Sequence, residues 1–113
     1  PADWHHPPDI EPPVGRVMVT VEYLIDPLRA GEFERIMDET RRMRLSEGAL
    51  NWELLHDLAD PQRYIEQIID ESWNEYLRRH DRATEADLAL REGRLAFHVG
   101  AEPPVVNRYV IGH

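Results

Sequence analysis

The chain has 113 residues, enough for one domain and too few for two. It carries 22 acidic against 13 basic residues, and the net charge of −9 argues against nucleic acid and against anionic membrane surfaces as partners. With no cysteine, it has no disulfide, thiolate nucleophile or cysteine-based zinc site, which fits a reducing, cytoplasmic compartment.

The first 15 residues hold five of the nine prolines. Proline at this density blocks helix and favours an extended chain, so residues 1–15 are predicted to form a linker or arm without regular structure, with Trp4 able to anchor it to a surface. Residues 16–113 are predicted to form the folded domain. The missing initiator methionine predicts a fragment or a processed chain.

Residues 17–25 alternate between two faces and are predicted to form the first strand. One face is wholly apolar and belongs under helices, whereas the other is mixed and has Glu22 as its acid. Asp26 and Pro27 then predict a helix start, and the helix is expected to run to Ser46. Its inner stripe consists of Phe33, Ile36, Met37, Thr40 and Arg44, and the run Arg41, Arg42, Arg44 is interpreted as a solvated helix end.

Residues 50–58 and 63–71 are predicted to form a hairpin around the turn at 59–62. Ser72 opens a second helix, and Thr84 opens a further helical stretch to about Ala96. Residues 105–111 form the last predicted strand. The order βαββα(α)β predicts an α+β fold of the ferredoxin-like class, an antiparallel sheet with helices on one face. Because the other face is mixed rather than polar, we expect a homodimer in which two sheets pack as a dimeric α+β barrel.

His80 is the best single candidate for chemistry, either as a general base or as an axial ligand. The alternative is a helix-end histidine with local hydrogen bonds. Glu22 and Glu66 are candidate acids on the barrel side, where they would either act as an acid–base pair or form ion pairs with Arg63 or Arg108. Glu53 and His56 alternate onto opposite faces of their strand, so both cannot line one cavity.

Trp52, Tyr64 and Trp73 are expected either to line an apolar pocket for a planar ligand or to belong to the core, and core is favoured for Trp73. No cofactor or metal is predicted, because the adjacent His5 and His6 lie in the arm and no helix carries a ligand spacing. The candidate ligand-binding residues are Glu22, Trp52, Glu66, Trp73 and His80, and no catalytic residue is assigned.

Several runs match one family in order along the chain. They are residues 15–27, 41–44, 48–52, 57–61, 71–80, 98–100 and 103–106. With them the chain resembles the soluble C-terminal domain of bacterial major facilitator superfamily exporters of the transmembrane secretion effector type. It is also similar to the antibiotic biosynthesis monooxygenase-like group of dimeric α+β barrels, which share Tyr76, Leu77 and His80 in outline.

The first resemblance implies a non-catalytic domain at the cytoplasmic face of the inner membrane, attached covalently to an upstream transporter domain. It would bind a small apolar or aromatic ligand, dimerise or regulate the exporter. The second implies the alternative, a cofactor-independent monooxygenase acting on an aromatic or polyketide-like substrate, which pairs a strand Asn with a Trp; Asn51 and Trp73 are residues of these types. Haem binding through His80 is disfavoured, because charged residues surround that histidine in the sequence.

Overall fold

The computed structural model describes residues 5–112 and places four strands and three α-helices among them. In chain order the elements are β1 (Val17–Leu24), a 3₁₀ turn (Pro27–Arg29), α1 (Ala30–Ser46), β2 (Asn51–His56), β3 (Arg63–Asp70), α2 (Trp73–Asp81), α3 (Glu85–Leu95) and β4 (Val105–Val110). The predicted order of strands and helices is confirmed, and most bounds differ from the predicted ones by one or two residues.

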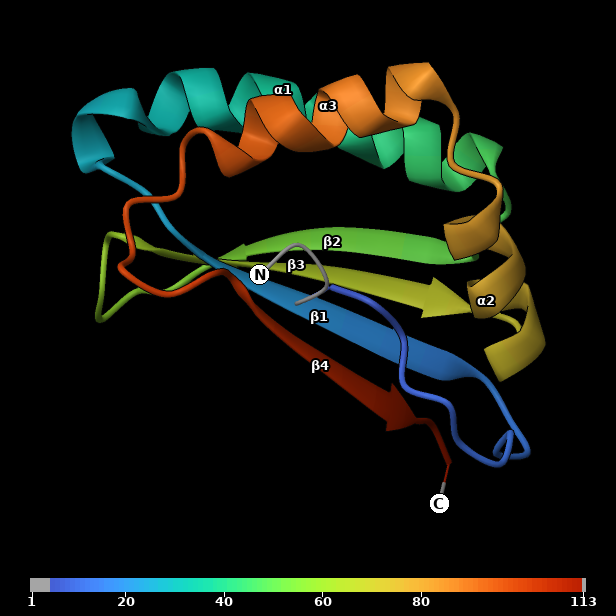
Figure 1. The fold of residues 1–113 in the computed structure, drawn as a ribbon. Helices are drawn as coiled ribbons and strands as arrows, with labels where there is room; N and C mark the ends of the chain where they lie inside the picture. Colours follow the sequence, from blue (N-terminus) through green and yellow to red (C-terminus); the bar gives the residue numbers. More distant parts are fainter. Residues whose placement is uncertain (1–4, 113) are drawn as a thin grey trace.

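The strands form one sheet in the order β2-β3-β1-β4, and every neighbouring pair is antiparallel. Helices α1 and α3 lie side by side over one face, and α2 covers the end of the sheet where β3 stops (Figure 1). The opposite face carries no helix in the part of the chain that the structure describes. This is the ferredoxin-like α+β arrangement that the sequence predicts.

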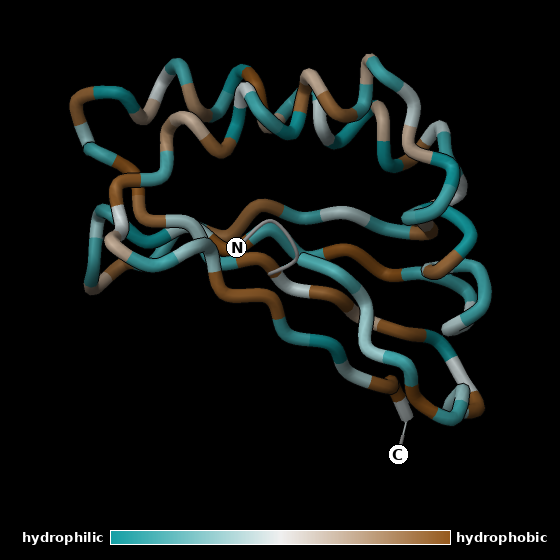
Figure 2. Tube along the Cα trace, viewed as in Figure 1, coloured by the Kyte–Doolittle hydropathy of each residue, from teal (hydrophilic) through white to brown (hydrophobic). Residues whose placement is uncertain are grey.

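The core lies between the sheet and α1. Every second residue of β1 is buried, from Val17 to Tyr23, and most of the strand is hydrophobic (Figure 2). Phe33 of α1 is fully buried, and its ring centroid lies 5.4 Å from that of Tyr23 and 5.2 Å from that of Tyr64. The apolar face of β1 is therefore under the helices, as predicted.

The first helix begins as Asp26 and Pro27 predict, but its first turn is tighter than expected. The Asp26 carboxylate accepts a hydrogen bond from the backbone N–H of Leu28 (3.0 Å), and residues 27–29 form a 3₁₀ turn before the α-helix starts. The chain leaves the helix through Gly48, whose φ of +113° is a conformation that only glycine adopts without strain.

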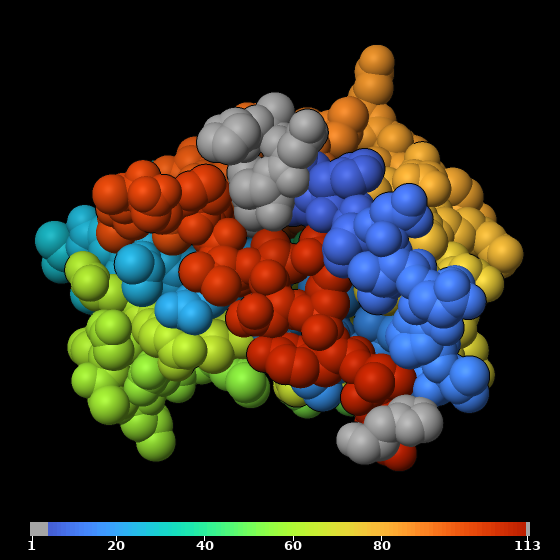
Figure 3. Space-filling view, turned by 60° about the horizontal axis from the view of Figure 1, so that its bottom comes forward, coloured from blue at the N-terminus to red at the C-terminus, as the bar shows by residue number. Residues whose placement is uncertain are grey.

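The N-terminal arm enters no helix or strand between His6 and Pro13, as its prolines predict. It nevertheless packs on the domain, because Pro7 is buried and Arg108 donates a hydrogen bond to the carbonyl oxygen of His5 (3.0 Å). The arm runs beside β4 and α2 (Figure 3). Trp4 lies outside the described residues, and a linker role for the arm stays a prediction.

Candidate functional site

A cavity of about 100 Å³ lies between the helix-facing side of the sheet and the helices. Its apolar wall comes mainly from β1, β3, β4 and α3, and includes Val19, Val21, Ile68, Leu95 and Val106. Its polar wall comes from all three helices and the arm, and includes Arg44, Arg79, Arg91, Arg94, His80 and His5. The space is several times what one water molecule needs, so it accommodates a small ligand or one ring of a larger one.

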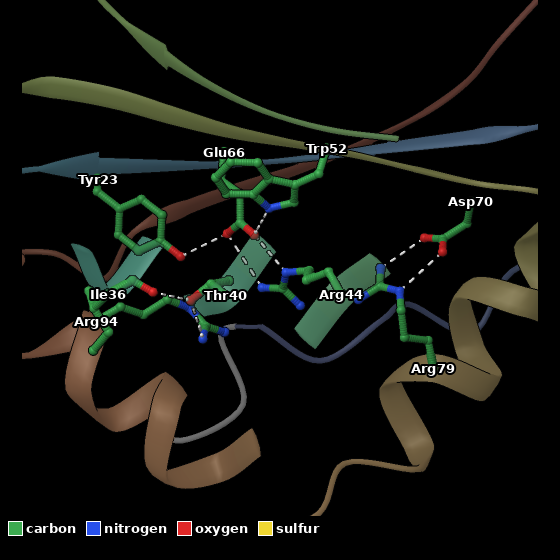
Figure 4. A network of polar contacts seen from close by, with 9 residues as sticks. All are labelled: Tyr23, Ile36, Thr40, Arg44, Trp52, Glu66, Asp70, Arg79 and Arg94. Atoms are coloured by element: carbon green, nitrogen blue, oxygen red, sulfur yellow. Dashed lines mark hydrogen bonds and ion pairs between the residues drawn. The ribbon is translucent and has the colours of Figure 1, made fainter. Parts of the chain in front are cut away.

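Glu66 is the centre of a buried polar network beside this cavity (Figure 4). Its side chain is fully buried on the helix-facing side of β3. Arg44 donates to both carboxylate oxygens, at 2.6 and 3.4 Å. The Trp52 indole N–H (2.8 Å) and the Tyr23 hydroxyl (3.1 Å) donate to the same carboxylate. Four donor contacts from one helix and two further strands therefore hold a single ionised group in place.

The charges in this network shift its pKa values strongly. Burial alone would raise the pKa of Glu66, but the positive charges of Arg44 and Arg94 outweigh it and lower the pKa to about 2. The pKa of Tyr23 is raised, first by burial and then by the negative charge of Glu66. At neutral pH, Glu66 is thus an anion and Tyr23 is a neutral hydrogen-bond donor.

A second buried ion pair closes the side of the cavity next to α2. Arg79 of α2 donates to both oxygens of Asp70, the last residue of β3, at 3.1 and 2.8 Å. Both side chains are almost fully buried. Two carboxylates of β3, four residues apart, therefore each hold one arginine in the cavity wall (Figure 4).

Arg94 of α3 is buried in the same wall without such a carboxylate. Its Nη1 lies 3.4 Å from the hydroxyl of Thr40, which itself donates to the carbonyl oxygen of Ile36 (2.9 Å). Its buried Nε has no hydrogen-bond partner. Burial and the positive charge of Arg44 both lower the pKa of Arg94.

Two carboxyl groups at the ends of α1 and α3 also line the cavity. Burial raises the pKa of Glu47 to about 7, and a hydrogen bond and repulsion from Asp87 act in the same direction. The pKa of Asp87 is lowered, first by that hydrogen bond. The two groups therefore hold a proton between them over much of the range below neutral pH.

His80 faces the arm in the wall of the cavity. Its ring centroid lies 5.7 Å from that of His5, 5.8 Å from that of His6 and 6.5 Å from that of Tyr76. Arg91 contacts Nε2 of His5 at 3.0 Å, and since arginine only donates, this nitrogen is the acceptor of the hydrogen bond. Burial, followed by the charges of the neighbouring histidines and Arg91, lowers the pKa of His80 from 6.5 to about 4 despite the opposing charge of Asp81.

This shift predicts that acid destabilises the protein through His80. A histidine whose pKa is lower in the folded chain contributes stability above pH 6.5, and this contribution is lost as the pH falls from 6.5 to about 4. Since His80 is only half-buried, screening by solvent reduces the effect, and we expect a loss of about 1 kcal/mol in the free energy of unfolding. Urea denaturation between pH 7 and pH 4.5 measures it.

The control for this experiment is His80→Asn, because Glu47 acts in the opposite direction. The raised pKa of Glu47 adds stability as the pH falls from about 7 to 4.5, and this contribution is present in both proteins. The difference between wild type and variant isolates His80. Parallel stability curves for the two proteins would show that His80 does not titrate as described.

The structure separates the two candidate acids, which corrects the prediction that both lie on the barrel side. In the β1–β3 register Glu22 pairs with Ile65 and Val21 pairs with Glu66, so Glu22 lies on the outer face and Glu66 lies under the helices. Glu22 forms an ion pair with Arg63 (2.9 and 3.2 Å), which was one of the expected partners. Glu66 pairs with Arg44 instead, so Arg44 is not part of a solvated helix end.

The aromatic candidates lie around the cavity rather than in its wall. Trp52 binds Glu66, and Trp73 is a core residue, 3% exposed and packed on Tyr76. Asn51 is exposed on the outer face of β2, so the structure does not bring Asn51 and Trp73 together. Glu53 and His56 lie on opposite faces, as predicted, with His56 stacked on Tyr64 (4.0 Å between centroids).

Of the five candidate residues, only His80 lines the cavity directly. Sequence reasoning missed Arg79, Arg91 and Arg94, although the spacing of Arg91 and Arg94 on one helix was a usable signal, since residues three apart share a helix face.

Among residues 5–112 the structure contains no group of three side chains placed to ligate a metal ion. It also has no helix in this range with the length and apolar character needed to cross a bilayer.

Fold and site together define a ferredoxin-like α+β domain with a cavity lined by arginines. The family described as transmembrane secretion effector matches residues 1–113, the whole length of the chain. The chain therefore belongs to the transmembrane secretion effector family. No curated protein matches it significantly.

Solved structures of the same fold come from several bacteria. A candidate antibiotic biosynthesis monooxygenase from Caulobacter crescentus CB15 is 20% identical, with a TM-score of 0.73 over 88% of this chain and 92% of that chain. One from Bordetella bronchiseptica is 21% identical, with a TM-score of 0.72 over 88% and 99%. SnoaB, a cofactor-independent oxygenase from Streptomyces nogalater, is 14% identical, with a TM-score of 0.72 over 88% and 96%. At these identities the likeness shows the fold alone.

Proposed function

We propose that this domain binds a small ligand in the cavity between the sheet and the helices, as a non-catalytic module of a bacterial exporter of the major facilitator superfamily. The observation that carries the proposal is the polar wall of the cavity, in which Arg44 and Arg79 are each held by a buried carboxylate. Buried ion pairs add little stability compared with apolar side chains of the same volume. Their presence around a cavity therefore supports a role in binding.

The ion pairs and the ionisation of the two buried acids, Glu66 and Asp70, support a non-catalytic role. Glu66 and Asp70 are each bound by an arginine through both carboxylate oxygens. The low pKa of Glu66, about 2, makes it a poor proton acceptor at neutral pH. The separation of Asn51 from Trp73 argues in the same direction, because oxygenases of the resembling group are expected to use such residues together.

Titration of the isotopically labelled domain with a panel of small aromatic compounds tests the binding function. We expect amide shifts at Val19, Ile68 and Val106, which line the cavity. The variant Val106→Phe fills the cavity and should abolish them, whereas Val105→Phe, at the next residue on the outer face, should leave them unchanged. Shifts confined to the outer face, or equal binding by both variants, would contradict the proposal.

The family to which the chain belongs supports a membrane attachment. We propose that the chain upstream of the arm crosses the inner membrane and that the domain lies on its cytoplasmic side. The coding frame upstream of Pro1 decides this point. A series of apolar spans of ~20 residues each is expected there, and a start codon directly before Pro1 would contradict the proposal.

The outer face of the sheet supports the proposed homodimer. Val105 and Tyr109 are about half exposed there, and Ile65 and Ile69 lie on the same face. Sedimentation equilibrium at micromolar concentration should give twice the mass of one chain, and Ile65→Asp should give the mass of one. A wild-type protein that sediments as a single chain would contradict the dimer.

One observation favours the alternative function, a cofactor-independent monooxygenase acting on an aromatic substrate. His80 lines the cavity, and its pKa of about 4 keeps it unprotonated at neutral pH, so that its ring can accept a hydrogen bond from a substrate hydroxyl group. Oxygen uptake with a quinol-type substrate tests this alternative. Turnover that is lost in His80→Ala would favour the enzyme over the binding module.

A further inference from the structure

Arg94 is the most unusual charged group in the molecule. Its residue is 4% exposed, and its side chain lies in the wall of the cavity. The Nε atom is buried and has no hydrogen-bond partner, and the side chain forms no ion pair with any carboxylate of residues 5–112. The nearby carboxylate of Glu66 is already bound by Arg44, Trp52 and Tyr23. The charge of Glu66 and a hydrogen bond to Tyr23 compensate the desolvation of this guanidinium only in part, because no carboxylate binds it directly.

The other arginines in the wall of the cavity each have a side-chain partner. Arg44 and Arg79 are each neutralised by one carboxylate, and Arg91 contacts the ring of His5. Among the four arginines that line the cavity, Arg94 alone has neither a carboxylate nor a histidine as a hydrogen-bond partner within residues 5–112. The missing counter-ion therefore points to a ligand.

The apolar wall and the volume of the cavity indicate the chemistry and the size of the rest of that ligand. The wall formed by the sheet contributes the side chains of Val19, Ile68 and Val106, which offer no polar group. A space of about 100 Å³ admits one ring with a short substituent. A fitting molecule has an apolar body and one anionic oxygen group, which suits the planar, multi-donor guanidinium.

We propose that Arg94 binds the carboxylate of a small aromatic acid in this cavity, an inference that rests on the proposed ligand-binding function and adds the chemical class of the ligand. The carboxylate supplies a directly bound counter-ion for the Arg94 side chain, which lines the cavity, and the ring packs on the valines and isoleucine of the sheet. The charge of Arg94 is then fully compensated only when the ligand is present. Arg94 therefore lowers the stability of the unliganded domain and raises its affinity for the ligand.

Benzoate and its neutral analogue benzamide are the probes. Titrations of the labelled domain at pH 7 should show benzoate binding at least tenfold more tightly than benzamide, with shifts at cavity residues. Arg94→Met should lose this preference and should raise the melting temperature of the unliganded domain, since it removes a buried charge that no carboxylate binds directly. A merely structural arginine would lower the melting temperature on removal. Arg35→Met, on the exposed side of α1, should change neither quantity.

The outcomes separate the two proposals. Equal binding of benzoate and benzamide, or a tenfold preference that survives in Arg94→Met, overturns the role of Arg94 and leaves the binding function standing. Absence of binding by both probes removes the binding function and the role of Arg94 with it. If Arg94→Met does not fold, the claim that Arg94 destabilises the unliganded domain is overturned, and the comparison of the two probes on wild type still decides the charge of the ligand.

Discussion

Glu66→Gln is expected to lower the free energy of unfolding by about 3–5 kcal/mol, because it leaves Arg44 buried without its negative partner. Glutamine preserves the shape of the side chain and an oxygen for Trp52, so the loss reports the charge rather than a cavity. Domains of this size are stable by about 5–15 kcal/mol, and the variant is expected to be marginally folded at 25 °C. Urea denaturation followed by circular dichroism measures the loss.

Glu22→Gln is the matched control, since it makes the same change in the same sheet. Glu22 pairs with Arg63 on the outer face, where both side chains are about one-third exposed, and we expect a loss below about 1 kcal/mol. The double variant Glu66→Leu with Arg44→Leu should recover much of the lost stability, because it removes both charges. Equal losses for Glu22→Gln and Glu66→Gln would show that burial does not determine the strength of these pairs.

Asp70→Ala should cost a similar amount, about 3–5 kcal/mol, because Arg79 loses both of its hydrogen bonds to a carboxylate while it stays buried. This pair also ties α2 to the end of β3, so the variant is expected to loosen α2 first. A double-mutant cycle with Arg79→Ala isolates the pair and should give a coupling energy of about 2 kcal/mol or more. Amide exchange along α2 reports the local effect.

The same helix provides the control for this cycle. Arg78 and Glu75 form an ion pair on the exposed side of α2, and its expected coupling energy is about 0.3–0.5 kcal/mol. Both cycles pair an arginine of α2 with a carboxylate, and they differ in burial and in the element that carries the carboxylate, β3 for Asp70 and α2 for Glu75. If the Asp70–Arg79 coupling were no larger than this value, the pair would not hold α2 on the sheet.

The architecture was predictable because its signals are local. The alternation in residues 17–25 gives both the strand and its buried face, Asp26 and Pro27 give a helix start, and Thr84 with Asp87 forms a capping box. Each of these features depends on residues close together in the chain. The 3₁₀ turn after Asp26 was missed, since the same start signals serve both kinds of helix.

The buried face of β3 was harder to predict. Each face of the strand carries two apolar or aromatic residues and two polar ones, so composition does not tell the buried face from the outer one: Tyr64, Glu66, Ile68 and Asp70 face the helices, and Arg63, Ile65, Gln67 and Ile69 face outwards. The two acids can be buried because of their arginine partners, which come from other elements. Arg44 is 22 residues from Glu66, and no local spacing reveals the pair. Sites built from long-range ion pairs are therefore invisible to periodicity.

The docking of the arm has a thermodynamic consequence. His5 belongs to the wall of the cavity, and Arg108 holds its carbonyl oxygen while it also donates to the hydroxyl of Tyr76 (2.8 Å). For any ligand that contacts His5, the factor by which a docked arm changes ligand affinity equals the factor by which the ligand changes arm docking. Ligand binding in the cavity and docking of the arm on the domain are then coupled equilibria. A force that pulls the arm away would weaken ligand binding, if a docked arm strengthens it, and a bound ligand would oppose that force to the same extent.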